Sequence, residues 1–194
     1  GKLNIGEPIG QDAPIWVFWW QGAEHVPFPV DRCIASIQKN SNGHDVRFID
    51  RNNYAEYVKL PEPILEKFKS GNISIAHFSD VLRIGLLLQY GGIWLDSTIF
   101  LNKPLPEKIA DVPFYSVCQG GARKWVVSKD RWSVSMLAAA PGNDLIHYCW
   151  DLLKDYLQRE QAFLAYLMLD CMIAIGYEEI PGFRRLILNV PVNN

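Results

Sequence analysis

The hydrophobic pattern of the chain is strongest in one stretch, where almost every residue from Ser74 to Tyr90 is apolar. A helix that is apolar on all sides is normally buried, and the hydroxyl of Ser74 is suited to cap its N-terminus. The pair Gly91-Gly92 is expected to end the helix, because glycine adopts the left-handed backbone of a C-cap without strain. The pattern therefore predicts a buried helix over residues 74–90.

A short apolar run follows this helix and predicts a buried strand over residues 93–95. The strand ends at Asp96, at the edge of the sheet where ligands bind in open α/β proteins. Asp80 and Arg83 are the formal charges within the helix, and they could form an i,i+3 ion pair that only satisfies itself. Alternatively, both could face one polar cleft together with Asp96. Desolvation offsets most of the Coulomb energy of a buried ion pair, so we favour the cleft.

The rest of the chain alternates between strand and helix patterns. Strands are predicted at residues 15–20, 44–50, 99–101, 113–118, 125–128 and 133–140, and helices at 29–39, 61–70, 144–158 and 162–176. The first strand is apolar at every position, which is typical of a mostly parallel sheet covered on both faces. Charged residues in the helix at 61–70 (Glu62, Glu66, Lys67 and Lys69) indicate a solvated surface helix. We expect a polar lead-in over residues 1–14 and a single α/β domain over residues 15–194.

Composition narrows the function classes. A chain of 194 residues with a net charge of −2 has no basic excess to support nucleic-acid binding. The cysteines are scattered and form no Cys-x-x-Cys pair, which argues against structural zinc and a disulfide scaffold (Cys33, Cys118, Cys149 and Cys171). No apolar run reaches the length of about 18 residues that spans a bilayer, and no signal peptide precedes the first strand. A cytoplasmic protein is expected, with peripheral contact at the inner face of the membrane left open.

Two motifs in the central stretch carry a resemblance to a known family. They are Ser79-Asp80-x-x-Arg83 and Gly91-Gly92-x-Trp94-Leu95-Asp96. Together they resemble the donor-site signature of retaining GT-A glycosyltransferases, in family 32 and in the large clostridial glucosylating toxins. The likeness is greatest to bacterial capsular polysaccharide synthesis proteins and covers residues 15–194. It implies a GT-A, Rossmann-like fold: a mixed, mostly parallel sheet flanked by helices. Because such proteins continue further, a missing C-terminal part is also expected.

The resemblance implies transfer of a sugar from a nucleotide-sugar, with a UDP-sugar preferred, to a glycan or lipid-linked acceptor. The product would be a capsular or other surface polysaccharide, formed with retention of configuration. Cleavage requires stabilisation of the leaving diphosphate, which Mn²⁺ or Mg²⁺ bound to oxygen ligands supplies. The Asp-x-Asp of the family is here Asp96-Ser97-Thr98. Asp96 and Thr98 would bind the cation weakly, because a hydroxyl is a neutral ligand, unless another carboxylate or the diphosphate compensates.

The resemblance also implies roles for individual residues, which position the substrate and stabilise charge rather than act as bases. Asp80 and Arg83 would hold the hydroxyls of the transferred sugar, and Asp96 would hold the ribose and the metal. Trp94 would pack beside the sugar or the nucleotide. The candidate catalytic residues are Asp80, Arg83, Asp96 and Asp170. The candidate nucleotide-sugar-binding residues are Trp19, Trp20, Gln21, Asp50, Asn52, Ser79, Asp80, Arg83, Trp94, Asp96 and Ser97.

Several of these candidates have structural alternatives. One of Trp19 and Trp20 would stack on the base, with Trp19 the first choice, and the other would belong to the core. Asp50 and Asn52 follow the second strand, where a base or ribose could be held, but they also suit a simple turn.

Asp170 is the one charge in the apolar segment 162–176. It could be capped by Tyr166 one helical turn earlier, whereas the resemblance places it near the donor sugar. A third group, Lys124, Lys129 and Arg131, could assist a diphosphate, although a solvated charged face is favoured.

Two other functions fit part of the pattern. A haloacid-dehalogenase-like phosphatase also has an apolar strand followed by an aspartate, but it needs a second aspartate where this chain has Thr98. That function would also leave Asp80 and Arg83 without a role. The alternative that stays open is a catalytically weak, glycosyltransferase-like module that binds a nucleotide-sugar or a glycan.

Overall fold

The computed structural model describes residues 3–4, 6–120, 123 and 125–194. The strands are β1 (Ile15–Phe18), β2 (Val46–Ile49), β3 (Gly92–Leu95), β4 (Phe114–Ser116) and β5 (Met136–Ala139). The helices are α1 (Val30–Lys39), α2 (Tyr54–Tyr57), α3 (Glu62–Lys69), α4 (Ile75–Tyr90), α5 (Asp144–Arg159), α6 (Met168–Glu179) and α7 (Pro181–Leu188). Short 3₁₀ helices lie at Ala23–His25 and Glu107–Ile109.

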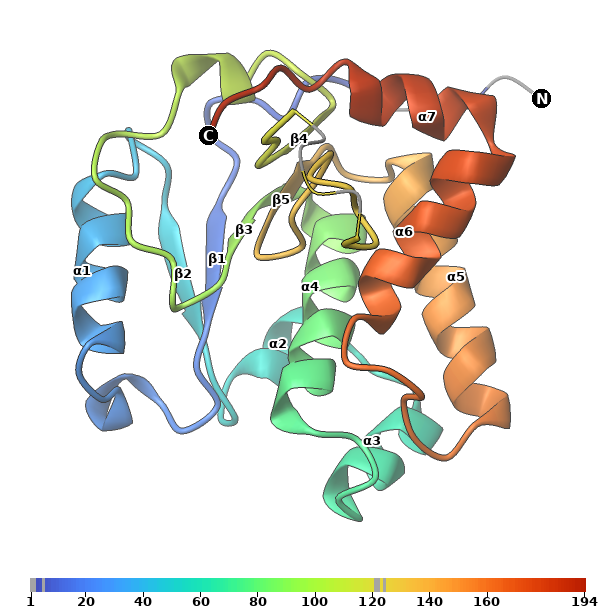
Figure 1. Cartoon of the computed structure of the whole chain (residues 1–194). Helices are drawn as coiled ribbons and strands as arrows, with labels where there is room; N and C mark the ends of the chain where they lie inside the picture. Colours follow the sequence, from blue (N-terminus) through green and yellow to red (C-terminus); the bar gives the residue numbers. More distant parts are fainter. Residues whose placement is uncertain (1–2, 5, 121–122, 124) are drawn as a thin grey trace.

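The strands form a mixed sheet in the order β2-β1-β3-β5-β4. β1 is parallel to both β2 and β3, whereas β5 is antiparallel to both β3 and β4. Figure 1 shows α1 on one side of this sheet and α4 on the other, with α5 and α6 outside α4. This arrangement confirms the predicted α/β class with a mixed sheet flanked by helices. Within the described ranges, no helix is both long and apolar enough to cross a membrane.

The strand order places β1 between the strands that follow it in the chain. One crossover leads from β1 to β2 on one side, and the next leads from β2 back to β3 on the other side. The chain continues from the carboxyl end of β1 toward β2 on one side, and from the carboxyl end of β3 toward β4 on the other. Both carboxyl ends lie at the same edge of the sheet. Such a topological switch point leaves a crevice in which ligands bind in open α/β sheets.

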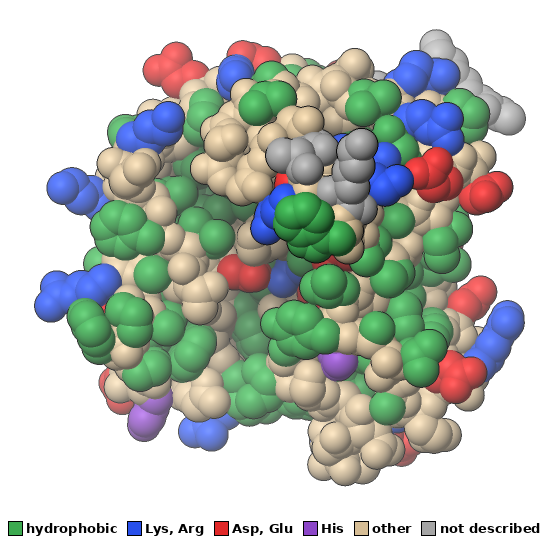
Figure 2. Space-filling view, in the orientation of Figure 1, with side chains coloured by type: hydrophobic (Ala, Val, Ile, Leu, Met, Phe, Trp, Pro, Cys, Tyr) green, Lys and Arg blue, Asp and Glu red, His purple; other side chains and the backbone are tan. Residues whose placement is uncertain are grey.

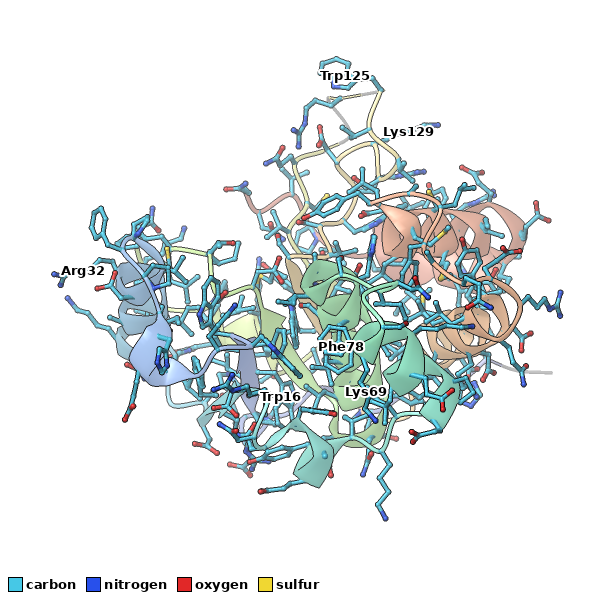
Figure 3. The ribbon with its side chains drawn as sticks, turned by 90° about the horizontal axis from the view of Figure 1, so that it is seen from below. Trp16, Arg32, Lys69, Phe78, Trp125 and Lys129 are labelled. Atoms are coloured by element: carbon cyan, nitrogen blue, oxygen red, sulfur yellow. The ribbon has the colours of Figure 1, made fainter. Side chains whose placement is uncertain are left out.

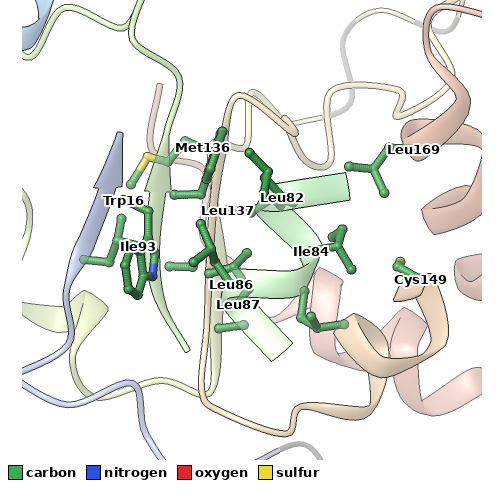
Figure 4. Close-up of a cluster of buried hydrophobic side chains, with 14 of the residues drawn as sticks. Trp16, Leu82, Ile84, Leu86, Leu87, Ile93, Met136, Leu137, Cys149 and Leu169 are labelled. Carbon is green, nitrogen blue, oxygen red and sulfur yellow. The ribbon is translucent and has the colours of Figure 1, made fainter. Parts of the chain in front are cut away.

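The middle of helix α4 is covered on all sides, and every residue from Val81 to Leu87 is buried. Figure 4 shows Leu82 and Leu86 pointing toward the sheet and Ile84 pointing toward Cys149 and Leu169 of the outer helices. The helix begins where predicted, because the Ser74 hydroxyl accepts a hydrogen bond from the backbone N–H of His77 at 3.2 Å.

Gly91 and Gly92 then turn the chain sharply from α4 into β3. Both have positive φ angles, +64° and +104°, which favour glycine. A Cβ at Gly91 would lie 2.6 Å from Cδ of Pro141, so the close approach of the chain also requires glycine here.

Several predicted elements differ in the structure. The strand expected at 15–20 ends at Phe18, and residues 99–101 and 125–128 form no strand. The backbone N–H of Leu101 donates to the Ser36 hydroxyl of α1 instead, and residues 125–130 form turns. The helix expected at 162–176 begins only at Met168, because the preceding residues form an exposed loop. Helix α7 was not predicted.

Lys67 corrects the interpretation of α3 as a fully solvated helix. Its side chain is buried, and its ammonium group donates to the backbone carbonyls of Leu157 and Glu160. These carbonyls belong to the last turn and C-cap of α5, where carbonyl groups lack helical partners and a cation is favourable. The four cysteines are free thiols, as expected.

Candidate active site

A cavity of about 310 Å³ lies at the switch point, at the carboxyl ends of β1 and β3; we call it the donor cavity, after the nucleotide-sugar donor that the sequence resemblance predicts. Figure 2 shows a hollow near the middle of this face, with acidic and basic side chains inside it. The polar and aromatic residues that line it are Phe18, Trp19, Trp20, Gln21, Ser79, Asp80, Arg83, Trp94, Asp96, Ser97, Thr98, Tyr166 and Asp170. The sheet edge, α4 and the start of α6 thus bring most of the predicted residues together.

The centre of the cavity is a guanidinium held between two carboxylates. Arg83 Nη1 lies 2.9 Å from Oδ1 of Asp80, and Arg83 Nη2 lies 2.9 Å from Oδ1 of Asp96. The Arg83 side chain is 4% exposed, whereas that of Asp96 is 30% exposed. The ion pair predicted within the helix therefore exists, and it also faces the cavity together with Asp96.

Helical spacing explains why these groups share one face. Ser79 and Arg83 are four residues apart, and Asp80 and Arg83 are three apart, so all three lie on the same side of α4. The tight turn after α4 then returns β3 alongside the helix, and the strand carries Asp96 to the same level.

Burial alters the acidity of Asp80. Removal of the carboxyl group from water raises the pKa of Asp80 from 3.8 to about 6, although the neighbouring Arg83 guanidinium opposes this shift. The charges of Asp96 and Asp170 raise the pKa further. Three carboxylates thus compete for one buried guanidinium, and such perturbed groups in a cleft are typical of functional sites.

The two carboxylate oxygens of Asp96 differ in their hydrogen bonds within the described part of the chain. Its Oδ1 accepts hydrogen bonds from Arg83 and from the indole N–H of Trp94, the latter at 2.7 Å. Among the described residues, Oδ2 has no hydrogen-bond partner. The Arg83 guanidinium also stacks over the Trp94 ring, 5.0 Å from its centroid. Trp94 is 1% exposed, so its main visible role is to orient Asp96 and Arg83.

Asp170 is held in a similar way by a residue that sequence reasoning missed. The indole N–H of Trp132 donates to Oδ1 of Asp170 at 3.0 Å, and both side chains are buried. Burial raises the pKa of Asp170, while this hydrogen bond and the charge of Arg83 lower it. Tyr166 does not cap Asp170: it lies before the helix and its side chain is largely exposed. No local spacing could have identified Trp132, because it is 38 residues from Asp170.

The two tryptophans after β1 differ in their surroundings. Trp20 packs against the rings of Tyr54, Phe68 and Phe78, with centroids 4.9 to 5.9 Å away. Trp19 instead donates its indole N–H to the carbonyl of His25 at 3.3 Å. Both line the donor cavity, but Trp20 is anchored in the core, so Trp19 has the freer ring face for a ligand.

Some predicted residues lie away from this cavity. Asp50 Oδ1 accepts the backbone N–H groups of Asn52 and Asn53, at 2.7 and 3.2 Å, so Asp50 and Asn52 form a turn and neither lines the cavity. Arg131 stacks on Tyr177, 3.8 Å from its centroid, and Lys129 is exposed. Lys124 lies outside the described residues.

The oxygen atoms that this cavity offers suit a divalent cation only when a bound substrate supplies further metal ligands. In the described part of the chain, no three His, Cys, Asp or Glu side chains are grouped to hold a metal ion. Asp96 nevertheless presents an unpaired carboxylate oxygen beside the exposed Thr98. Mg²⁺ commonly binds through one or two carboxylates together with substrate phosphates, which suits this arrangement.

Comparison with known proteins gives a consistent picture. The profile of a family described as capsular polysaccharide synthesis protein matches residues 4–194. The O-glycosyltransferase braB of Annulohypoxylon truncatum is 31% identical over 114 residues, covering 54% of this chain and 27% of the relative. The glycosyltransferase afumC of Aspergillus fumigatus is 24% identical over 159 residues, covering 72% and 39%. The chain thus spans well under half of these relatives. The structure of the PaToxG glycosyltransferase has a TM-score of 0.60 at 20% identity, covering 96% of this chain and 80% of that one, so it shares the fold.

Proposed function

The chain belongs to the family of capsular polysaccharide synthesis proteins, and from this premise we propose that it forms the donor-binding part of a retaining glycosyltransferase. The donor would be a nucleotide-sugar, with a UDP-sugar as the first candidate. The sugar would pass to a hydroxyl group of a glycan or lipid-linked acceptor, in the synthesis of a surface polysaccharide. The relatives of this chain that carry glycosyltransferase names support the reaction class.

The observation that carries this proposal is the guanidinium between two carboxylates at the topological switch point. In this proposal Asp80 accepts hydrogen bonds from hydroxyls of the transferred sugar, because a buried carboxylate with an open oxygen binds such donors strongly. Arg83 holds hydroxyls of the same sugar together with Asp80, beside the phosphate that departs as the glycosidic bond breaks. Arg83 needs no reorganisation for this, because Asp80 and Asp96 already fix its position.

Asp96 would contribute its unpaired oxygen to the ribose and to a divalent cation, with Thr98 as a weak second ligand. Mn²⁺ or Mg²⁺ at this position would stabilise the charge of the leaving diphosphate. Asp170, which is held by Trp132 and also lines the cavity, would face the sugar. Ser79, Ser97 and Gln21 supply further hydrogen-bonding groups in the lining, and Trp19 would stack on the base.

A binding module without turnover is the second candidate, and one observation favours it. Asp96 and Thr98 provide only one carboxylate at the expected metal position, and no three-ligand metal cluster exists among the described residues. A module of this kind would bind the nucleotide-sugar through the same residues. It would differ only in releasing no nucleotide.

Release of free nucleotide separates the two candidates. We would incubate the chain with a panel of nucleotide-sugars, with and without Mn²⁺, and measure nucleoside diphosphate release and binding. The proposal predicts release from at least one donor and a loss of about a hundredfold or more in Asp96→Asn. Asp151→Asn, on the outer surface of α5, is the matched control and should behave as the unaltered chain. Binding without release under any metal would support the module, and near-normal activity of Asp96→Asn would contradict the assigned site.

A further inference from the structure

A second and larger cavity adjoins the donor cavity. It has a volume of about 710 Å³, and we call it the second cavity. The two cavities share Asp96, Thr98, Val134, Tyr166, Leu167 and Asp170 in their linings. A molecule in the second cavity would therefore reach the same carboxylates from the side opposite Trp19 and Gln21, which line only the donor cavity.

Apolar side chains provide the larger part of the exposed walls of the second cavity, and polar side chains such as Asn102, Gln119 and Asn193 lie among them. Ile99, Leu101 and Leu105 lie on the wall formed by the segment after β3, and Val117, Val126 and Val127 lie on the wall formed by the segment between β4 and β5. Water in contact with these side chains is released when an apolar ligand replaces it, which favours binding.

One pair of opposite charges in the second cavity neutralises itself. Arg123 Nη2 lies 2.6 Å from Oδ1 of Asp130, and the backbone N–H of Arg123 donates to Oδ2 of Asp130 at 2.7 Å. Besides this pair and the shared Asp96 and Asp170, Lys103 is the charged residue of the lining, and it is exposed. Among the described residues, the interior therefore adds no unpaired cation to the carboxylates of Asp96 and Asp170, so a negatively charged acceptor is disfavoured.

Exposed apolar side chains continue from the cavity to the surface. Phe100, Tyr166 and Leu167 line it and are 62%, 73% and 44% exposed. Figure 3 shows Trp125, which is 82% exposed, at the tip of a loop that projects from the body of the molecule. Trp125 directly precedes the lining residue Val126. Apolar patches of this kind on a soluble domain mark binding sites.

We propose that the second cavity binds the acceptor and that this acceptor is a neutral molecule carrying its hydroxyl group on an apolar body. The inference rests on the proposed function of the donor cavity and chooses between the two acceptor classes considered there. The volume and apolar lining match sites for small molecules, which measure about 300–1,000 Å³. In the transfer, the acceptor oxygen bonds to the anomeric carbon while the bond from that carbon to the diphosphate oxygen breaks. The electron pair stays on the diphosphate, which also receives the hydroxyl proton.

The test uses 1-hexanol, 1-octanol and maltotriose as acceptors, with the donor identified by nucleotide release. We expect kcat/KM for glycoside formation to rise about three- to fourfold per added methylene, and maltotriose to be at least about tenfold poorer than 1-octanol. Val127→Asp should lower the ratio of 1-octanol glycosylation to donor hydrolysis about tenfold or more, because it places a charge in the apolar wall. Val126→Asp is a second variant in case the first fails to fold. Ile175→Asp, on an exposed apolar site of α6, is the matched control and should leave the ratio unchanged.

Equal use of maltotriose and 1-octanol, no dependence on chain length, or unchanged ratios in both valine variants would overturn the acceptor inference. Donor hydrolysis is measured separately, so its absence would count against the proposed function alone. In that case calorimetric binding of 1-octanol decides the acceptor inference. Binding that Val127→Asp weakens about tenfold would support it, and the absence of binding would overturn it.

Discussion

Arg83 of α4 lies 2.9 Å from Asp96 at the end of β3, measured between Nη2 and Oδ1. The contact joins a buried helix to the strand that follows it and fixes two opposite charges at the edge of the sheet. Because the same guanidinium also holds Asp80, its removal would leave two carboxylates facing each other in a poorly hydrated space. Stability and function are therefore coupled at this residue.

Arg83→Ala should lower the free energy of unfolding by about 3–5 kcal/mol, since breaking a buried ion pair leaves uncompensated charge. Urea denaturation measures this value. Arg32→Ala, which removes an exposed pair with Asp31, should cost less than about 1 kcal/mol. In Asp80→Asn/Arg83→Ala the loss should be smaller than the sum of the single changes, because the repulsion is relieved. Additive losses would contradict direct coupling of Asp80 and Arg83.

Loss of Arg83 should also weaken binding of the nucleotide-sugar more than binding of the free nucleoside diphosphate. We expect Arg83→Ala to weaken binding of the nucleotide-sugar by at least about tenfold, and of free nucleoside diphosphate by much less, because the sugar hydroxyls lose the ordered Asp80–Arg83 pair. Isothermal titration calorimetry with both ligands tests this. Equal losses of affinity would show that the pair does not contact the sugar.

Restoring a second carboxylate should strengthen the metal site. Thr98→Asp replaces an exposed neutral ligand with a charged one beside the open oxygen of Asp96, so Mn²⁺ affinity in the presence of nucleoside diphosphate should rise about tenfold or more. Thr98→Asn is the uncharged control and should show no comparable gain. Unchanged affinity in Thr98→Asp would place the cation elsewhere.

Trp132→Phe should move the acidic limb of the pH–rate profile to higher pH. The hydrogen bond from the Trp132 indole lowers the pKa of Asp170, so its loss lets burial raise that pKa further. The Arg83 charge, which also lowers this pKa, is unchanged in the variant. In an Asp170→Asn background the same substitution should cause no shift. A uniform loss of activity without a shift would assign Trp132 a packing role only.

Because of Asp80, the free energy of unfolding should fall as the pH rises, which is opposite to the usual effect of a carboxylate. Burial, the largest cause, raises the pKa of Asp80 from 3.8 to about 6, so the folded state favours its protonated form. The resulting stability is fully present below pH 3.8 and is lost as the pH rises through about 6. Relative to Asp80→Asn, the unaltered chain should lose on the order of 2 kcal/mol between pH 4 and pH 7. Parallel curves for the two proteins would contradict this pKa.

The sequence was most informative where local rules apply. Ser74 and Gly91 bound α4 as expected, and the i,i+3 spacing of Asp80 and Arg83 determined that they meet. The short turn into β3 then made the approach of Asp96 foreseeable. These contacts need only helical geometry and a tight connection.

Long-range contacts could not be foreseen in this way. Trp132 reaches Asp170 from a segment far away in the chain, and Lys67 reaches the end of α5 across 90 residues. Hydrophobic periodicity predicts neither contact, because tertiary packing brings the partners together. The apolar residues before Met168 suggested a longer helix, yet several of them, including Leu164, are exposed beside the cavities.

The two cavities differ in the secondary structure that lines them. About half of the residues that line the donor cavity lie in regular elements, most of them in α4, whereas nearly all of those that line the second cavity lie in loops. Loops tolerate substitution and changes of length better than regular elements do. Under the proposed roles of the two cavities, substitutions in these loops would alter which acceptor is used and leave donor binding unchanged, which offers a route for engineering acceptor preference.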